Sequence, residues 1–558
     1  MYQKNESKTR AISLQKAYRI EDYLYILPLI FVIIIFSLTN CAESAGNKAD
    51  APDGAITEDS AETIDLGEIS DDNLVDIESV DDSTELQASS ETSSDSTRAN
   101  RRNSNNNSTV TGPTVTSSTP LDGASDVSLD TSITATLSGQ VKVSTLNSGV
   151  LLKNAALKTI PATINFNTET GILSITPVYL DYNTSYTITV SPLVTDANGN
   201  AAEATEIVFT TENITSVSSI LDDAGDNGQF NALTHDSSNN LHIAYKDETN
   251  SKLKYMIYNT STEETVTSDV DTIDNPGTHV SLVLDDSEAA HLSYRRSGTK
   301  SLVYATNSQG SFASTVADGS NSGKHTATVI NSSDNTDIVY WEKVEGVNSL
   351  GYAYGDYQGG FTAESIDTSD VADMGLSMAI DANDNLHVAY QSNTEGDRHL
   401  KYAYFNATSQ AWSTEIIDET NDDNGIFPVI KLDANENIYI FYQYNTNQLK
   451  KLLCTTNASG DWVSSIVFAT RENIVSFNPA VSMDENGYFH VSFYDSANNV
   501  IRYANNVYGF WATAIAGSAG DYTESLSSID VANGNVYITY YYREGEEGNL
   551  SLFTISDY

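Results

Sequence analysis

The sequence predicts an all-β protein in which a β-sandwich is followed by a seven-bladed β-propeller, behind a signal segment and a disordered acidic linker. Three observations support this prediction. Short segments of alternating apolar and polar residues run from residue 110 to the C-terminus. From about residue 213 onward, one pattern recurs with a mean period of about 49 residues. The chain has 76 Asp and Glu residues against 28 Lys and Arg, and a formal net charge of −48.

The charge limits the partners of the molecule. A strongly acidic protein is repelled by polyanions, so we exclude nucleic acid as a ligand of the chain as a whole. The 2 Cys residues cannot build a disulfide framework. At 39% hydrophobic residues, the chain is not a bundle of membrane-spanning helices.

Residues 1–41 are predicted to be an export signal. An apolar run extends from Leu24 to Leu38 and is followed by Thr39, Asn40 and Cys41. The run is short for a helix that crosses a hydrocarbon core of about 30 Å. It resembles a bacterial lipoprotein signal, although Asn40 stands where that family usually has Gly, Ala or Ser. The resemblance implies lipidation of Cys41 and anchoring to the outer membrane or cell surface.

A signal-anchor helix and an ordinary cleaved signal are the alternatives for this segment. All three interpretations place the remainder of the chain outside the cytoplasm.

Residues 42–109 are predicted to form a disordered acidic linker. Positions 42–108 contain 17 acidic and 4 basic residues and no Trp, Tyr or Phe. Such a segment cannot bury enough apolar surface to offset its ordering entropy, and its charges repel one another. We expect a spacer that lifts the folded domains off the membrane; a tail that binds cations or a partner is the alternative.

Residues 110–212 predict a β-sandwich of about 100 residues and about seven strands, which suits an immunoglobulin-like (Ig-like) fold without a disulfide. Alternating segments lie at 132–139, 162–167, 171–177, 185–192 and 206–211, with turn residues between them. The motifs Thr-Pro-Leu-Asp-Gly-Ala at 119–124, Asp-Ala-Asn-Gly-Asn at 196–200 and Phe-Thr-Thr at 209–211 resemble a bacterial Ig-like family of surface-layer and adhesin-type proteins. The resemblance implies a spacer or weak binding module without catalysis.

Residues 213–558 are predicted to form a seven-bladed β-propeller. Each repeat has a polar turn, a central residue within an apolar strand, and in most copies an aromatic residue three positions later. About four strands fit into each repeat, and a period of 40–50 residues with four strands is typical of a propeller blade. The central residues of the seven repeats are His242, His291, Asp337, His387, Tyr439, His490 and Tyr537.

We also expect a strand from the start of this region to complete the last blade. The seventh repeat ends after its third strand, and residues 214–221 resemble the fourth strand of another repeat. Pairing of this segment with the last strand would close the ring and remove exposed sheet edges.

The recurring histidines are predicted to be structural, because equivalent positions diverge around a ring whereas metal ligands converge within about 2 Å of one ion. A ligand-binding or catalytic role is the alternative. The Asp- and Asn-rich segments at 381–385, 433–437 and 484–487 are predicted to be hairpin turns. They lack the glutamate of an EF-hand loop, so we expect no cofactor, with calcium in these turns as the alternative. Cys454 is expected in the core.

The ligand site is expected where the repeats differ, at the mouth of the ring where the first strand starts and the second strand ends. The first strands are expected to start at Phe230, His279, His325, Gly375, Phe427, Asn478 and Ser525. Blades 2 and 3 combine scarce basic groups with an aromatic ring, which favours an acidic or sugar ligand, with arginines pairing with carboxylates and Trp341 stacking. The candidate residues are His279, Arg295, Arg296, His325, Trp341, Glu342 and Lys343. Solvated loop charges without a ligand are the alternative.

These observations predict a non-enzymatic cell-surface lipoprotein whose propeller binds carbohydrate or another surface macromolecule. The sequence lacks Gly-x-Ser-x-Gly, His-Glu-x-x-His and a phosphate-binding loop. A propeller hydrolase or lyase acting on polysaccharide is an alternative, because paired carboxylates could lie among so many acidic residues. A scaffold subunit of an envelope complex is the other.

Overall fold

The computed structural model describes residues 112–556 except 320, 370, 394–397, 419–422, 447–449, 471–476, 521–526 and 546. The predicted signal segment with Cys41, and the predicted acidic linker, lie outside the described residues. In the described part of the chain, helices are short, and none is long and apolar enough to cross a membrane.

The first folded part of the described chain is an Ig-like sandwich of two sheets. One sheet has the order β1 (Val115–Thr119), β3 (Ile133–Leu137), β7 (Ile172–Pro177), β6 (Ala162–Asn167). The other has the order β2 (Ala124–Val127), β10 (Thr205–Thr211), β9 (Ser185–Val190), β4 (Val150–Asn154), β5 (Thr159–Ile160). A 3-10 turn (Val143–Thr145) and the single-turn helix α1 (Leu146–Gly149) precede β4.

Period-2 patterning explains the sandwich. The buried positions alternate with less buried ones along β3 and β9, as the alternating sequence predicts. Tyr186, Ile188 and Phe209 are among the most buried residues of the core.

A seven-bladed β-propeller follows. Its first four blades are β12 (Asn227–His235) to β15 (Thr265–Asp271), β16 (Thr278–Leu284) to β19 (Ala313–Asp318), β20 (Lys324–Ile330) to β23 (Gly360–Asp367), and β24 (Val371–Ile380) to β27 (Ala411–Ile416). The fifth and sixth are β28 (Asp423–Leu432) to β31 (Val463–Thr470) and β32 (Ala480–Met483) to β35 (Trp511–Ser518). The seventh contains β36 (Ser527–Ala532), β37 (Asn535–Glu544) and β38 (Glu547–Ser556).

Each of the first six blades has two middle strands. Their bounds are β13 (Leu241–Asp247), β14 (Lys252–Tyr258), β17 (Ala290–Arg296), β18 (Ser301–Thr306), β21 (Thr336–Val344), β22 (Val347–Asp356), β25 (Leu386–Ser392), β26 (Leu400–Asn406), β29 (Ile438–Asn445), β30 (Lys450–Thr456), β33 (Phe489–Asp495) and β34 (Val500–Asn505).

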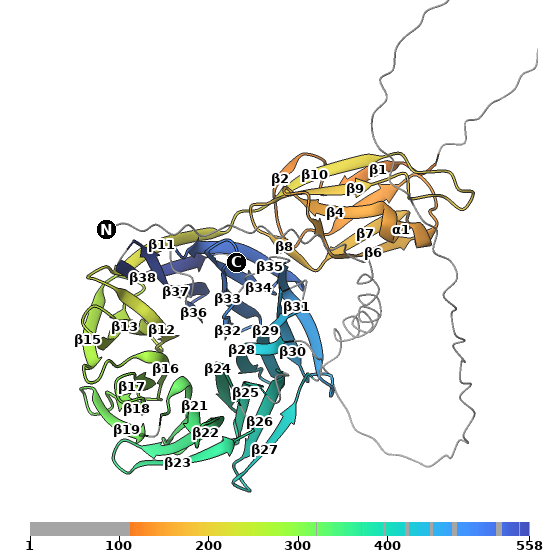
Figure 1. Ribbon diagram of the computed structural model, residues 1–558. Coiled ribbons are helices and arrows are strands. Elements are labelled where there is room, and N and C mark those ends of the chain that lie inside the picture. The colour runs from red at the N-terminus through yellow and green to blue at the C-terminus, as the bar shows by residue number, and fades with distance from the viewer. Residues whose placement is uncertain are drawn as a thin grey trace, which may run out of the picture. The chain divides into compact units, whose positions relative to one another are not determined.

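The first strand of each blade lies innermost. Figure 1 shows the blades arranged around a central axis, and the first strands of neighbouring blades contact each other around the ring. Their side chains therefore surround the central axis. The second strands are almost wholly buried between blades, and Cys454 is buried on β30 as expected.

The predicted closure of the ring is confirmed. Strand β11 (Thr215–Asp222) pairs antiparallel with β38 from Thr215↔Ser556 to Asp222↔Leu550, and the sheet order is β11-β38-β37-β36. The last blade therefore takes its outer strand from the start of the propeller segment.

One strand of the Ig-like segment joins the propeller, which the sequence did not predict. Strand β8 (Tyr179–Asp181) pairs in parallel with β35 and becomes the fifth strand of blade six. The Thr513 hydroxyl donates to Asp181 Oδ1, and Asn505 Nδ2 donates to Tyr182 Oη at 3.3 Å. The outer edge of blade six is thus covered by chain from the Ig-like segment.

A repeated hydrogen bond connects neighbouring blades. A tyrosine on the second strand donates its hydroxyl to an aspartate that ends, or in the case of Asp418 closely follows, the outer strand of the preceding blade. The five consecutive pairs are Tyr245–Asp222 (2.7 Å), Tyr294–Asp271 (2.7 Å), Tyr340–Asp318 (3.0 Å), Tyr390–Asp367 (2.6 Å) and Tyr442–Asp418 (3.5 Å). These bonds fix the angular position of each blade at the buried seam.

Removal of residues 549–558 from the full chain should abolish cooperative unfolding of the propeller. The deletion takes away most of β38 and leaves both β11 and β37 with unpaired edges. Calorimetry and circular dichroism would measure the change, and Val217→Ser, at a position 66% exposed on β11, is the control. An unchanged melting transition after the deletion would disprove closure by β11.

An ion pair between the first strands of blades 1 and 7 should make stability depend on pH. His235 Nδ1 lies 2.7 Å from Asp530 Oδ2, and Ser482 donates to the other carboxylate oxygen at 3.0 Å. The hydrogen bond with Asp530 raises the pKa of His235 more than partial burial lowers it. A raised folded pKa contributes stability that is complete below about pH 6.5 and is lost as pH rises through the folded value.

The stability difference between the parent and His235→Gln should therefore be largest near pH 6 and shrink toward pH 8, with both numbers set by the ordinary histidine pKa of about 6.5. Denaturant unfolding at several pH values would measure it. A difference that grows with pH would contradict the assigned pair.

Candidate functional site

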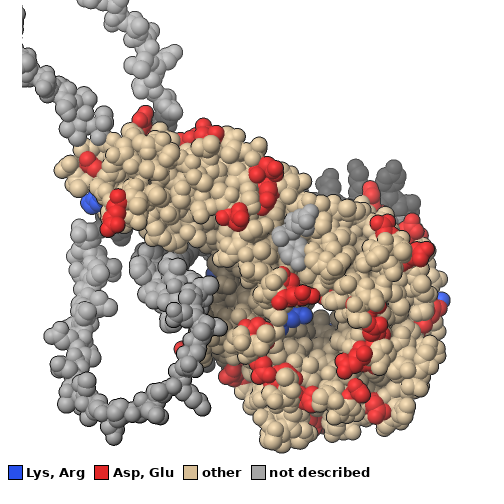
Figure 2. Space-filling view, turned by 180° about the vertical axis from the view of Figure 1, so that it is seen from behind, with Lys and Arg blue, Asp and Glu red and all other residues tan. Residues whose placement is uncertain are grey.

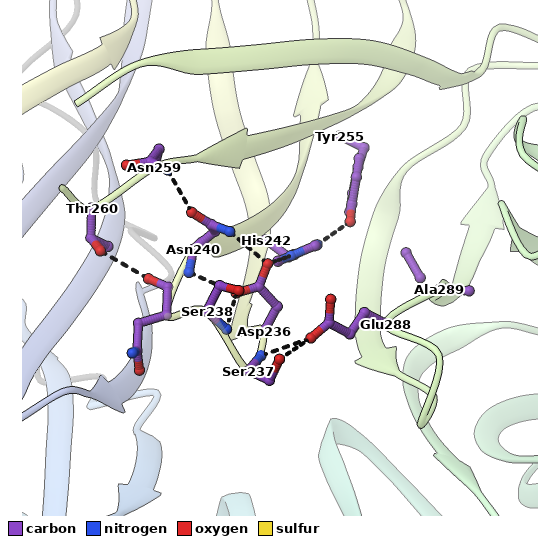
Figure 3. Close-up of polar contacts among 12 residues, drawn as sticks. Asp236, Ser237, Ser238, Asn240, His242, Tyr255, Asn259, Thr260, Glu288 and Ala289 are labelled. Carbon is purple, nitrogen blue, oxygen red and sulfur yellow. Dashed lines mark hydrogen bonds and ion pairs between the residues drawn. The ribbon is translucent and has the colours of Figure 1, made fainter. Parts of the chain in front are cut away.

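The recurring histidines connect strands within their own blades, as predicted. In blade 1, Nδ1 of His242 is hydrogen-bonded to the Tyr255 hydroxyl, and Nε2 lies 3.2 Å from Asp236 Oδ2 (Figure 3). The same arrangement recurs as Asp285–His291–Tyr304, Asp381–His387–Tyr402 and Asp484–His490–Tyr503. Burial lowers the pKa of His387, and lowers that of His490 to about 4. These imidazoles are part of the scaffold.

The Asp- and Asn-rich segments are hairpin turns. Oδ1 of Asp381, Asp433 and Asp484 accepts hydrogen bonds from backbone N–H groups two and four residues further on. A hollow of about 430 Å³ lies between the corresponding turns of blades 1 and 2, where Ser237 donates to Glu288 (Figure 3). Among the described residues, no group of three or more His, Cys, Asp or Glu is placed to hold a metal ion.

The positions expected to start the first strands form the candidate site. Each of the six described ones has a left-handed backbone: Phe230 (φ 48°), His279 (54°), His325 (47°), Gly375 (83°), Phe427 (49°) and Asn478 (38°). In the first five blades, the pairing of the first and second strands shifts register across this residue. Such a β-bulge re-aims a side chain, and the left-handed conformation of a non-Gly residue costs of order 1 kcal/mol or more.

The bulge residues of neighbouring blades touch one another. The ring centroids of Phe230 and His279 are 5.1 Å apart, and those of His279 and His325 are 4.4 Å apart. A Cβ atom on Gly375 would lie 3.0 Å from Phe427 Cα, so only glycine lets this neighbour approach so closely. We call these six residues, Phe230, His279, His325, Gly375, Phe427 and Asn478, the axial ring; all are half-buried.

A charged cluster adjoins the axial ring at blades 3 and 4. Asp373 accepts from His325 Nε2 at 3.0 Å and from Lys324 Nζ, whose amine also lies 4.8 Å from the Trp341 ring centroid. Burial would raise the pKa of Asp373, but these two partners hold it well below its usual range. The Lys324 and Asp373 side chains are 32% and 34% exposed, so both can meet a ligand from solvent.

His279 is kept neutral. Burial lowers the pKa of His279 well below the ordinary value. The neighbouring His325, Lys324 and Arg295 lower it further, and Asp373 raises it by a smaller amount. A neutral imidazole can accept a hydrogen bond or a proton.

The two predicted arginines go to different neighbours because successive strand residues face opposite ways. Arg295 is buried and donates to Ser322 O at 3.0 Å and to Asn321 Oδ1 at 3.2 Å, on the approach to blade 3. Arg296 donates from Nε to Asp271 Oδ2 at 2.7 Å, at the seam with blade 1. The structure therefore places only Arg295 beside the axial ring.

The predicted residues of blade 3 also lie in different surroundings. Trp341 is 6% exposed and covered by Lys324, so the expectation of an open stacking platform is wrong. Glu342 is buried, accepts from the Ser365 hydroxyl at 2.5 Å, and has a pKa raised by burial. Lys343 is exposed at the surface.

Two residues of the cluster were missed in the sequence. Lys324 precedes the bulge residue His325, and Asp373 lies two positions before Gly375. Their proximity to the bulge positions is a signal that could have found them, because both flank a residue directed at the mouth.

The centre of the propeller is hollowed on the face seen in Figure 2, and a basic side chain lies there beside acidic ones. The rest of this face is studded mainly with acidic side chains. A separate hollow of about 370 Å³ on the Ig-like segment is lined by residues such as Gly112, Gln140 and Asp196.

Comparison with known proteins identifies the first module. A family model of the bacterial Ig-like domain matches residues 109–211. A search of curated proteins finds no match to this sequence.

Several solved structures are similar to the chain at low identity. A polysaccharide lyase described as an ulvan lyase bound to -[GlcA(1-4)Rha3S]- has a TM-score of 0.42 and 11% identity, covering 60% of this chain and 97% of its own. For the phage phi92 endosialidase, these values are 0.40, 10%, 63% and 71%. For a mutant Aleuria aurantia lectin in complex with α-methyl-L-fucoside, they are 0.36, 10%, 52% and 95%. The propeller assignment itself rests on the sheet order described above.

Asp271→Asn should destabilise the protein by about 3–5 kcal/mol, because it leaves the buried Arg296 guanidinium without its carboxylate. Denaturant unfolding would measure the loss. Asp269→Asn, two residues away on the same strand, is the control: its pair with Lys252 is exposed, so stability should hardly change. Equal losses in the two variants would contradict a structural role for Arg296.

Proposed function

We propose that the protein is an exported binding protein whose propeller binds carbohydrate at the axial ring. The observation that supports this most is the contact of three ring side chains from consecutive blades, Phe230, His279 and His325, next to the partly exposed Asp373–Lys324 pair. Sugars present apolar C–H faces that pack on rings and hydroxyls that bond to carboxylates and amines. A mainly apolar site with a few placed polar groups is the usual form of a small-ligand site.

The placement of the protein is part of the proposal. Lipidation at Cys41 would anchor the chain at the outer membrane or cell surface, and the acidic linker would separate the folded part from the bilayer. The Ig-like segment joins blade six through β8, so it would hold the propeller on this linker as a firmly attached support.

An enzyme acting on polysaccharide at the same site is the second candidate. It is favoured by the contact of the His279 ring with His325, next to the Asp373 carboxylate and the Lys324 amine, because such groups can transfer protons. Release of unsaturated or reducing sugar ends when the protein is incubated with a panel of polysaccharides would show that it is an enzyme and not only a binding protein.

Asp373→Asn and His279→Asn should each reduce glycan binding by about tenfold or more, because each removes a group that contacts the ligand. Asparagine suits position 279 because it tolerates the left-handed backbone there. Binding of the full-length protein to a glycan array, followed by titration calorimetry, would measure the loss. Val316→Asn, at a position 49% exposed on the outer strand of blade 2, is the control. Unchanged binding in both ring variants would contradict the site.

A further inference from the structure

Among the described residues, Arg295 is a buried cation that bonds to no carboxylate. Of the Lys and Arg side chains that are almost fully buried in the described part of the chain, Lys246 pairs with Glu248 and Arg296 with Asp271. Arg295 is 7% exposed and bonds only to the neutral Ser322 O and Asn321 Oδ1 among the described residues. A buried charge without a counter-ion is costly, so a counter-ion from a ligand would be bound favourably at this point.

The position of Arg295 links this charge to the axial ring. Arg295 is the register partner of Thr278, the residue before His279. Its guanidinium bonds to the backbone of Ser322, two residues before Lys324. Arg295 therefore connects the strand pair that contains His279 with the segment that leads to His325, and the rings of these two histidines are in contact.

The charges of the described residues around this point do not balance. Lys324 and Arg295 are both cationic, and Asp373 is the carboxylate that bonds to Lys324 and the acidic group that acts on Arg295. His325 shares the same carboxylate. Among these described side chains, positive charge is in excess, in a chain whose net charge is −48.

We propose that the axial ring binds carbohydrate that bears a carboxylate, with Arg295 and Lys324 as the groups that hold the acid. This inference rests on the proposed carbohydrate-binding function and names the class of its ligand. The guanidinium donates through a planar fork that matches a carboxylate, and the N–H groups that do not bond to Ser322 and Asn321 are left for it. The ring faces of Phe230 and His279 would pack against the sugar body.

The test compares three probes of equal length on the full-length protein: an oligogalacturonate, a neutral galacto-oligosaccharide and a sulfated, carboxylate-free galactan oligosaccharide. We expect the oligogalacturonate to bind about tenfold or more tightly than either other probe, since charge-assisted bonds are the stronger ones. Its affinity should fall as salt is raised. Titration calorimetry at two salt concentrations measures both.

Variants assign the effect to the named groups. Arg295→Gln should lose about tenfold in affinity for oligogalacturonate, because the uncharged amide keeps a hydrogen-bond donor but removes the charge that pairs with the ligand carboxylate. Lys324→Gln, at a half-exposed position, should act in the same direction and provides the test if Arg295→Gln fails to fold. Lys252→Gln, an exposed lysine paired with Asp269 on blade 1, is the control and should not change affinity.

The outcomes separate this inference from the proposed function. Equal binding of neutral and carboxylated probes would overturn the acidic class and leave carbohydrate binding in place. Preference for the sulfated probe would overturn the carboxylate assignment. Binding of none of the three probes, or an unchanged affinity in both Arg295→Gln and Lys324→Gln, would overturn the inference, and only the first of these also contradicts the proposed function.

Discussion

The hydrogen bond from a second-strand tyrosine to the aspartate that ends the preceding blade is the constraint on which the propeller depends. It joins five consecutive pairs of blades, from Tyr245–Asp222 to Tyr442–Asp418, and in every pair the tyrosine side chain is buried. Loss of such a bond would leave a polar group without its partner and would lower the stability of the protein. These bonds therefore favour one angular arrangement of the blades. Pairing of β11 with β38 then closes the ring. Together they place the first strands of all blades around one axis.

The axial ring is a consequence of that arrangement. In each of the six blades where this position is described, the residue has a left-handed backbone, and the repetition shows that this conformation belongs to the scaffold. The side chain at this position varies among the blades and is phenylalanine, histidine, glycine or asparagine. A constant backbone with variable side chains brings Phe230, His279 and His325 into contact and places Asp373, Lys324 and Arg295 nearby. The chemistry of the mouth can thus change without a change of fold.

Much of the architecture could be predicted from the sequence because each repeat has the same markers. Counting from these markers also placed His279 and His325 at one mouth. The sequence does not predict which side of the strand Arg295 and Arg296 each point to. That depends on the register of strand pairing, which shifts at the bulge between Thr278 and Ser281. The burial of Trp341 depends on Lys324, which comes from a different strand. Strand β8 is only three residues long, and its partner is more than 300 residues away, so local patterning gives no signal for it.

The central claim is that the axial ring is the place where an acidic sugar is held. A crystal structure of the full-length protein with a bound oligogalacturonate tests it most directly. We expect a ligand carboxylate to bond to Arg295 or Lys324 and the sugar ring to pack on Phe230 or His279. A ligand found only elsewhere, such as in the turn hollow beside Glu288 or on the Ig-like segment near Gln140, would contradict it.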